Sequence, residues 1–380
     1  MQIFQNLNVD FLSKRKTAYI ISGTLLVLGL LSLFIRGLEL GIDFKGGSEI
    51  ALQFEQPIDI TEIRDITTSM NLGKVEVKTF GGETGVLIRT DLQEIPQESF
   101  DKYVNVINSE IDKIIPGLEK RIVDRSGSSI TYAFENADTV NTLNAELFKQ
   151  GFQVSKGSPD IDNTHLIVRV GFADMMQEVL REELPGNRFT VQKEDLVGPK
   201  IGDELKANAI IAVVLALIVI LIYLGFRFKF IFAAGAVIAL FHDVMITLGA
   251  FSLLYGLTDF LNLEISINVV AAFLTLVGYS INDTVIVFDR IRENLKIHKT
   301  DDLANNINKA INKTMPRTIV TSLTTLVVTF VLLVFGGEVL RGFAFTLSFG
   351  ILIGTYSSVF VASPVVYEYA MKAKSKIQFS

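Results

Sequence analysis

The chain has 380 residues, of which 49% are hydrophobic and 20% are charged, with a formal net charge of -6 and no cysteine. The mean hydropathy is positive, at +0.41, so this many charged residues excludes an evenly mixed soluble protein: apolar and polar residues must be separated into blocks. The lack of cysteine excludes a disulfide framework, and any domain outside the cytoplasm must be held together by its core.

Six apolar segments are long enough to cross a membrane, since a spanning helix needs about 17 to 25 residues. No small-residue cleavage site follows the first segment, which is therefore interpreted as a retained helix and not as a signal peptide. The predicted fold class is membrane α-helical with six transmembrane helices. The segments are residues 17–36, 207–226, 230–254, 265–288, 317–335 and 342–366.

Lysine and arginine gather at alternate ends of these segments. Because basic loops stay in the cytoplasm, this bias predicts a cytoplasmic N-terminus (1–16), loop (289–316) and tail (367–380). By parity, residues 37–206 form a large extracytoplasmic domain. Charges alternate with helical spacing in residues 289–313, which predicts an interfacial helix. The basic residues used are Lys14, Arg15, Lys16, Arg227, Lys229, Arg290, Arg292, Lys296, Lys299, Lys309, Lys313, Arg317, Lys372, Lys374 and Lys376.

The large domain has soluble α+β patterning and an apparent repeat. Residues 45–125 are predicted to form one βαββαβ unit, and residues 126–196 repeat that order. Two such units predict tandem ferredoxin-like sandwiches. The predicted strands are 48–54, 74–79, 85–90, 120–125, 128–134, 152–155, 165–171 and 188–196, and the predicted helices are 60–70, 97–115, 137–150 and 173–183.

Glycine-rich motifs lie where this domain joins the membrane helices. Glycine permits positive φ and close backbone approach, so the motifs are interpreted as structural joints. A phosphate-binding Gly-x-x-x-x-Gly-Lys-Ser/Thr motif is absent from the sequence, so any work must draw on a gradient or on a partner's nucleotide hydrolysis. The joint residues are Asp43, Gly46, Gly47, Gly198, Pro199 and Gly202.

Asp283 stands inside the fourth apolar segment. An unpaired carboxylate near the bilayer interior costs roughly 2.5 to 3.5 kcal/mol, so intramembrane acids are by default functional. Polar residues recur around it at helical spacing and form a stripe that includes Ser280 and Asn282. Thr321 and Thr325 continue a second stripe on the fifth segment, after Arg317.

We expect these two stripes to face each other, which brings Asp283 and Arg317 to compatible depths. Burial favours the neutral carboxyl group, whereas an adjacent guanidinium favours the carboxylate. A site balanced between the two can change protonation when the helices move apart. The alternative is a static ion pair that only fixes helix packing.

A second intramembrane pair, His242 and Asp243, lies near the middle of the third segment. Neighbouring helical residues point about 100° apart, so the two side chains cannot face one partner in the same way. Either residue is a candidate proton carrier, since histidine titrates near neutral pH. A metal site is not predicted, because the remaining histidines, His165 and His298, lie in other regions.

Small residues predict close helix packing in the sixth segment, where Gly350 and Gly354 form a Gly-x-x-x-Gly motif. Six helices alone form a thin bundle with polar stripes that need cover. A partner of similar architecture is therefore expected at this face.

Together, these motifs closely resemble the SecD/SecF family of protein translocase subunits, and its SecF members in particular. The resemblance rests on the segments Gly-Ile-Asp-Phe-x-Gly-Gly from Gly41, Val-Gly-Pro-x-x-Gly from Val197, and Ser-Ile-Asn-Asp-Thr from Ser280, together with Pro316-Arg317-Thr318. It implies a six-helix half of an RND-superfamily fold that pairs with SecD and couples proton flow to export. In that family, the positions matching Asp283 and Arg317 are implicated in proton conduction, and the outer domain is usually one βαββαβ unit.

The sequence therefore predicts a multi-pass inner-membrane auxiliary of Sec protein export. We expect it to use the proton gradient with a SecD-like partner, the SecYEG channel and exported preproteins, and to be neither an enzyme nor a binder of cofactors, nucleotides or nucleic acid. The main alternative is half of an RND-type proton-coupled exporter of small molecules or lipids. A third is a scaffold or sensor, for which Asp283 would be dispensable.

Overall fold

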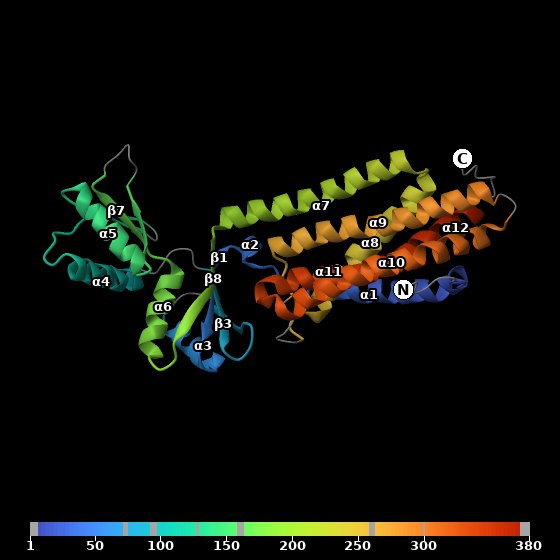
Figure 1. Cartoon of the computed structure of the whole chain (residues 1–380). Helices are drawn as coiled ribbons and strands as arrows, with labels where there is room; N and C mark the ends of the chain where they lie inside the picture. The colour runs from blue at the N-terminus through green and yellow to red at the C-terminus, as the bar shows by residue number, and fades with distance from the viewer. Residues whose placement is uncertain are drawn as a thin grey trace. The chain divides into compact units, whose positions relative to one another are not determined.

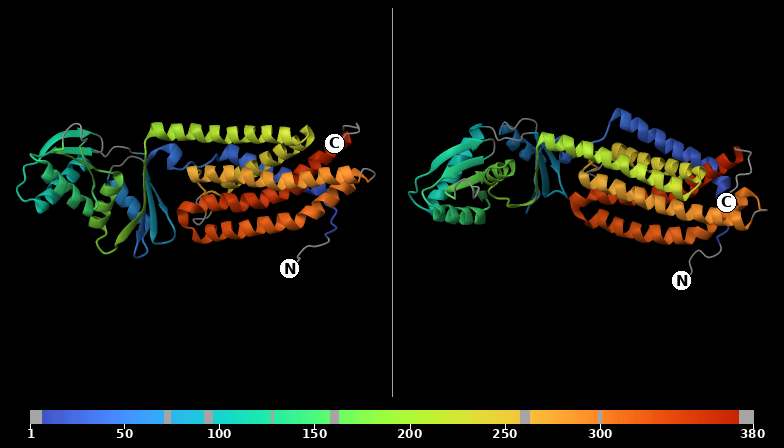
Figure 2. Two further views of the ribbon diagram at one scale, coloured as in Figure 1. Left: turned by 45° about the horizontal axis from the view of Figure 1, so that its top comes forward. Right: turned by 90° about the horizontal axis from the view of Figure 1, so that it is seen from above.

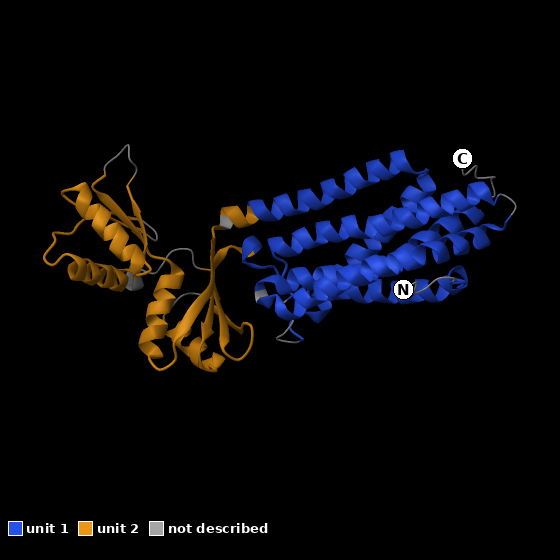
Figure 3. Ribbon diagram, viewed as in Figure 1, with its two compact units in different colours: residues 1–44, 204–380 blue, residues 45–203 orange. Residues whose placement is uncertain are grey.

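A computed structural model describes residues 7–70, 75–91, 97–126, 129–157, 163–257, 263–298 and 301–372. The chain divides into two compact units (Figure 3). Unit 1 contains residues 1–44 and 204–380, and unit 2 contains residues 45–203. Several sequence positions used above lie outside the described residues: Lys74, Ser128, Lys299, Lys374 and Lys376.

Unit 1 is a bundle of long helices that run alongside one another (Figures 1 and 2). Within the described residues, six helical spans are long and apolar enough to cross a membrane, which confirms the predicted number. The last span is one continuous rod built from α11, a π-helical segment and α12. The helices are α1 (Arg15–Ile35), α7 (Pro199–Arg227), α8 (Phe230–Leu254), α9 (Ile267–Ile297), α10 (Leu303–Phe335), α11 (Gly337–Ser357), the π segment (Ser358–Ala362) and α12 (Ser363–Lys372).

The predicted loop at residues 289–316 is different in the structure. Helix α9 continues beyond the apolar segment to Ile297, and α10 begins at Leu303, well before its apolar part. The prediction of one interfacial helix at residues 289–313 is therefore wrong, because the charged segment forms the ends of two long helices. Pro316 lies inside α10, and its neighbours remain helical.

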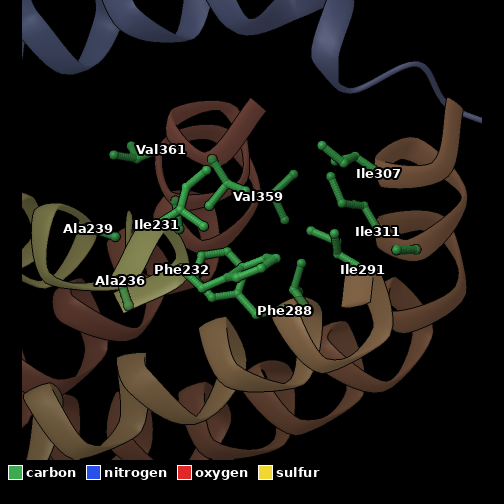
Figure 4. Close-up of a cluster of buried hydrophobic side chains, with 14 of the residues drawn as sticks. Ile231, Phe232, Ala236, Ala239, Phe288, Ile291, Ile307, Ile311, Val359 and Val361 are labelled. Atoms are coloured by element: carbon green, nitrogen blue, oxygen red, sulfur yellow. The ribbon is translucent and has the colours of Figure 1, made fainter. Parts of the chain in front are cut away.

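One end of the bundle has a packed hydrophobic core (Figure 4). Phe232 of α8 and Phe288 of α9 meet edge to face, with their ring centroids 5.2 Å apart. Ile307 of α10 and Val359 of the π segment belong to the same cluster. Because Phe288 lies five residues after Asp283 on α9, this core fixes that part of α9 against its neighbours.

Unit 2 contains all eight strands of the described chain, and their positions agree with the predicted ones to within one or two residues. They form two antiparallel four-stranded sheets. The strands are β1 (Gly47–Phe54), β2 (Val75–Thr79), β3 (Gly85–Thr90), β4 (Arg121–Ser126), β5 (Ser129–Ala133), β6 (Gln153–Lys156), β7 (His165–Arg169) and β8 (Phe189–Val197), and the helices are α3 (Ile60–Ser69), α4 (Gln97–Ile114), α5 (Ala137–Lys149) and α6 (Phe172–Glu183). A short helix, α2 (Ile42–Lys45), spans the start of the unit.

The strand pairing differs from the predicted tandem repeat. The first sheet has the order β2-β3-β1-β8, so its fourth strand comes from the end of the unit. The second has the order β4-β5-β7-β6, so β4 pairs with the strands that follow it. The boundary predicted at residue 126 is wrong. Strand β8 lies in the predicted second half but pairs in the first sheet, and β4 lies in the predicted first half but pairs in the second sheet.

The hydrophobic cores follow the same exchange. Met176 and Leu180 of α6 pack with Ile50 of the first sheet. Ile107 of α4 packs with Tyr132 of the second sheet. Unit 2 is thus one ferredoxin-like fold, β1-α3-β2-β3-α6-β8, into which a circularly permuted second copy, α4-β4-β5-α5-β6-β7, is inserted after β3.

This nesting predicts the outcome of a deletion. Replacing residues 92–170 by a glycine-serine linker of about 4 to 6 residues should leave unit 2 folded, because the first sheet keeps all four strands and both helices. The gap is short, since Ser48 pairs with Thr90 and lines the same cavity as Gly171. The rate of limited proteolysis of unit 2, compared between the protein with this deletion and the full-length protein, measures whether the unit is folded.

The matched control removes residues 126–196, the second unit of the tandem interpretation. That deletion takes away α6 and β8, so it should expose the core of the first sheet and yield rapid digestion of the remainder. Equal protease resistance of the two shortened proteins would contradict the nested topology.

Candidate functional site

Asp283 is buried in the middle of unit 1, with 2% of its surface exposed. It belongs to the face of α9 that also carries the buried residues Ser280 and Val287, at helical spacing. Its Oδ2 accepts a hydrogen bond from Ser322 Oγ of α10 at 3.3 Å. Ser322 Oγ in turn accepts one from Thr355 Oγ1 of α11 at 2.8 Å, so the carboxyl group lies where three helices meet.

Arg317 does not pair with Asp283 directly. Both residues are described, and they form no ion pair with each other in the structure, where Arg317 is exposed. The buried face of α10 carries Thr318 and Ser322, one residue further along the helix than the predicted stripe at Arg317 and Thr321. One residue corresponds to about 100° around a helix, which turns the guanidinium away from α9.

The remaining stripe residues divide into two groups. Thr325 Oγ1 of α10 accepts a hydrogen bond from the hydroxyl of Tyr279 of α9 at 3.4 Å, so this stripe residue does contact α9. Thr321 is exposed and donates to the carbonyl oxygen of Arg317 in its own helix at 3.0 Å. Asn282 is also exposed. Within this chain, Thr321 and Asn282 thus face outward and take no part in the contact between α9 and α10.

Asp243 lies at the centre of a second polar cluster and is 1% exposed. Its Oδ2 accepts hydrogen bonds from Ser280 Oγ of α9 at 2.6 Å and from Ser357 Oγ of α11 at 2.8 Å. Its Oδ1 is 2.9 Å from Nδ1 of His242. One carboxyl group therefore ties α8 to α9 and α11, while Ser280 lies only three residues before Asp283 on α9.

His242 faces the opposite way and contacts the first helix. Its Nε2 is 3.0 Å from Ser22 Oγ of α1, and that oxygen is 3.1 Å from the hydroxyl of Tyr356 in α11. The Tyr356 hydroxyl donates to the carbonyl oxygen of Ala18 at 2.9 Å. As predicted from the 100° angle between neighbouring helical residues, His242 and Asp243 bond to different helices, and they also bond to each other.

Sequence reasoning missed Ser22, Ser322, Tyr356 and Ser357. Isolated hydroxyl residues in apolar helices carry no periodic signal of their own. Ser357 does come just before the π-helical segment, where Ser363 Oγ donates to the carbonyl oxygen of Ser358, five residues back, at 2.9 Å. Such irregular turns are frequent at functional sites. Pro364, just after the π-helical segment, was the sequence feature that could have indicated an irregular turn here.

The N-terminal joint is bonded to the helix that carries Asp283. Asp43 Oδ2 accepts a hydrogen bond from the backbone N–H of Ile267 at 2.8 Å, at the start of α9. The positive end of the helix dipole favours a carboxylate there. Gly46 and Gly47 have φ of 73° and 116°, and a Cβ on Gly47 would collide with the carbonyl oxygen of Thr90. Two glycines are therefore required at this joint.

The C-terminal joint needs glycine less. Helix α7 begins at Pro199, and the N–H of Gly202 donates to the carbonyl oxygen of Gly198 at 2.9 Å within its first turn. A Cβ on Gly198 would meet nothing within 4 Å. The expectation of close backbone approach is therefore not met at Gly198 among the residues that the structure describes.

Gly350 and Gly354 pack inside the chain and not against a partner. A Cβ on Gly350 would collide with the side chain of Leu276 in α9, and one on Gly354 would lie 3.2 Å from Cβ of Ser280. The prediction that this face needs an external partner is wrong, since α9 covers it. The close approach is also what allows Ser357 and Ser280 to reach the same carboxylate.

Across the described part of the chain, groups of three or more histidine, cysteine or acidic side chains suited to a metal ion are not found. The buried polar groups of unit 1 include the carboxyl groups of Asp243 and Asp283, the imidazole of His242 and several hydroxyl groups. These groups can bind and release protons and can change hydrogen-bond partners between helices.

Comparisons with known proteins agree with this architecture. The family model of protein export membrane protein SecD/SecF, C-terminal, matches residues 177–372, and that of the SecD/SecF GG motif matches residues 31–58. The crystal structure of SecDF from Thermus thermophilus, described as a translocon-associated membrane protein, is 29% identical with a TM-score of 0.64. That match covers 96% of this chain and 39% of the other, so this chain spans about two fifths of the length of SecDF.

A chain with six membrane-capable helices, buried carboxyl groups and both SecD/SecF signatures is a multi-pass inner-membrane protein of the SecD/SecF class. Protein translocase subunit SecF of Rhodothermus marinus is 41% identical over 376 residues, covering 99% of this chain and 98% of the relative. The Helicobacter pylori protein of that name is 31% identical and covers 96% of this chain and 88% of the relative. The chain belongs to the SecF family.

Proposed function

We propose that this protein is an auxiliary subunit of Sec protein export that acts with a SecD-like partner and the SecYEG channel. In this proposal the proton gradient supplies the energy with which preproteins complete their translocation. The observation that carries it is Asp283, a buried carboxyl group in a membrane-spanning helix, which accepts a hydrogen bond from Ser322 of α10, itself bonded to Thr355 of α11. Membership of the SecF family supports the link to export.

Asp283 is the proposed proton-binding group. A charged aspartate in this setting costs roughly 2.5 to 3.5 kcal/mol, whereas the protonated form can exchange hydrogen bonds with Ser322. Binding a proton therefore changes the free energy of holding α9 against α10 by a few kcal/mol. Arg317 is proposed to tune this step through its charge, and Asp243 to serve as a second site.

A partner subunit is supported by the surface of unit 1. Of the 18 most apolar consecutive residues of α7, only 6% are buried inside this chain, and of those of α10 only 17%. The outward polar residues Asn282, Arg317 and Thr321 would face lipid if nothing covered them. A subunit with its own six-helix bundle would cover them, as the polar stripes require.

The test uses inverted membrane vesicles that contain SecYEG and the SecD-like partner, prepared with and without this chain. With an imposed proton gradient, vesicles with the chain should complete translocation of a trapped preprotein faster, and without a gradient the difference should vanish. Equal rates with and without the chain under a gradient would overturn the proposal. Uptake of a small molecule or lipid would favour the exporter alternative, which the relatives do not support.

The proposed orientation places both chain ends in the cytoplasm and unit 2 outside. Single cysteines are clean labels, because the chain contains none. In intact spheroplasts, a membrane-impermeant maleimide should react with Thr68→Cys in α3 and should not react with Lys372→Cys in α12 until the cells are opened. Both positions are exposed. Labelling of Lys372→Cys alone in intact spheroplasts would reverse the orientation.

A further inference from the structure

The cluster around His242 contains a continuous chain of four hydrogen bonds. It runs from the carbonyl oxygen of Ala18 to the Tyr356 hydroxyl (2.9 Å), on to Ser22 Oγ (3.1 Å), to His242 Nε2 (3.0 Å), and from His242 Nδ1 to Asp243 Oδ1 (2.9 Å). The chain begins on α1, passes through α11 and α1 again, and ends on α8.

Four hydrogen bonds need four hydrogens, and the donors can be counted. A tyrosine, a serine and a neutral histidine supply one hydrogen each, and an ionised aspartate supplies none. Tyr356 must donate to Ala18, because a carbonyl oxygen only accepts. Ser22 must then donate to Tyr356, and His242 must donate from Nε2 to Ser22. The bond between His242 Nδ1 and Asp243 therefore needs a fourth hydrogen that these groups do not supply.

We infer that the His242–Asp243 pair carries one bound proton in this conformation, shared between Nδ1 and Oδ1. When the proton leaves, three hydrogens remain for four bonds, and one bond must break. If the imidazole keeps its hydrogen on Nδ1 to satisfy Asp243, Nε2 becomes an acceptor and Ser22 turns to donate to it. Either the bond between Ser22 and Tyr356 or the bond between Tyr356 and Ala18 is then lost.

Both of those bonds join α1 to α11, so the proton state of the pair controls a contact between these two helices. The other groups facing the pair are hydroxyls: Ser22 from α1, Ser280 from α9, and Tyr356 and Ser357 from α11. The hydrogen bonds that Asp243 accepts come from His242, Ser280 and Ser357, none of which is a lysine or an arginine. The proton on the pair is therefore not replaced by a neighbouring cation.

This inference deepens the second site that the proposed function places at Asp243, and only the use of that site in export rests on the proposal. The site differs from Asp283 in what it moves. Asp283 bonds α9 to α10, whereas the His242–Asp243 pair bonds α8 to α1, the helix that leads directly to the Asp43 joint.

The proton count can be measured without any transport assay. The chain has three histidines, so His165→Gln with His298→Gln leaves His242 as the only imidazole. Nitrogen-15 NMR of this protein in lipid nanodiscs should show a hydrogen on Nε2 at neutral pH. The extra proton should then appear in one of two places. Either the NMR spectrum shows a hydrogen on Nδ1 as well, or the infrared spectrum shows a carboxylic-acid band that Asp243→Asn removes. The infrared measurement is made in an Asp283→Asn background.

Two pairs of variants then test the network with opposite signs. Without the hydroxyl of Ser22 or Tyr356, the remaining bonds need no extra hydrogen, so Ser22→Ala and Tyr356→Phe should lower the proton affinity of the pair about tenfold, the worth of one hydrogen bond. Ser280 and Ser357 donate to the carboxylate and favour its ionised form. Ser280→Ala and Ser357→Ala should therefore raise the proton affinity.

Two results would overturn the inference. One is an imidazole with its only hydrogen on Nδ1, beside an ionised Asp243, over the whole pH range in which the protein is folded. The other is a shift of the same sign in Ser22→Ala and Ser280→Ala, which would show that the hydroxyls act through packing alone. Neither readout depends on export, so failure here leaves the export proposal standing, and failure of the export test leaves the proton count standing.

Discussion

Export that depends on the proton gradient is expected to disappear in Asp283→Asn, while the protein remains folded and inserted. Asparagine has the size of aspartate and can still accept the hydrogen bond from Ser322, so the free energy of unfolding should change by less than about 1.5 kcal/mol. What is lost is the group that binds and releases a proton. The rate of preprotein translocation into inverted vesicles, with a gradient imposed, should fall to the rate measured without one.

The matched control is Asp289→Asn, on the same helix and six residues further along. Asp289 pairs with Arg227 at 3.1 Å, but the two side chains are 42% and 43% exposed, and such pairs contribute about 0 to 1 kcal/mol. This variant should export at the normal rate. Normal export by Asp283→Asn, or equal loss in both variants, would contradict the role given to Asp283.

Arg317 extends the same prediction. Because Arg317 is proposed to tune Asp283 through its charge and not through contact, Arg317→Met should slow export in the wild-type background and add little in the Asp283→Asn background. Losses that add fully, with measurable activity in each single variant, would show that the two residues act separately.

Asp243→Ala is expected to have the largest effect on stability. The substitution leaves His242, Ser280 and Ser357 without their shared acceptor in a buried site. One orphaned donor costs about 1 to 3 kcal/mol in water-soluble proteins, whereas hydrogen bonds between membrane helices average about 0.6 kcal/mol. Three together predict a loss of about 2 to 4 kcal/mol in the free energy of unfolding, measured by titration with a denaturing detergent.

Asp289→Ala again serves as the control and should cost less than about 1 kcal/mol. Asp243→Asn should fall between the two, since its amide oxygen can accept from the serines. A loss in Asp243→Ala no larger than that in Asp289→Ala would show that the cluster does not hold the bundle together.

Much of this protein could be predicted from its sequence. Segment length and hydropathy determined six membrane-capable helices, because the bilayer sets how many apolar residues a helix needs. Local periodicity placed the strands β1 to β8 and the helices α3 to α6 of unit 2 to within one or two residues. The isolated charge of Asp283 marked a candidate functional position, since a charged residue inside a membrane helix costs free energy.

The tertiary structure alone decided which elements meet. Strand β1 pairs with β8, more than a hundred residues away, and the repeated order of elements is the same whether the two halves are tandem or nested. The sequence predicted that the face of α10 with Arg317 and Thr321 contacts α9, whereas the face with Thr318 and Ser322 does so. The two faces differ by one residue, or about 100° of rotation around the helix. The hydrogen-bond chain through Ser22, His242 and Tyr356 joins three helices and leaves no trace in local sequence. Periodicity reports the conformation of one segment, whereas pairing and hydrogen-bond satisfaction are properties of segments brought together by packing.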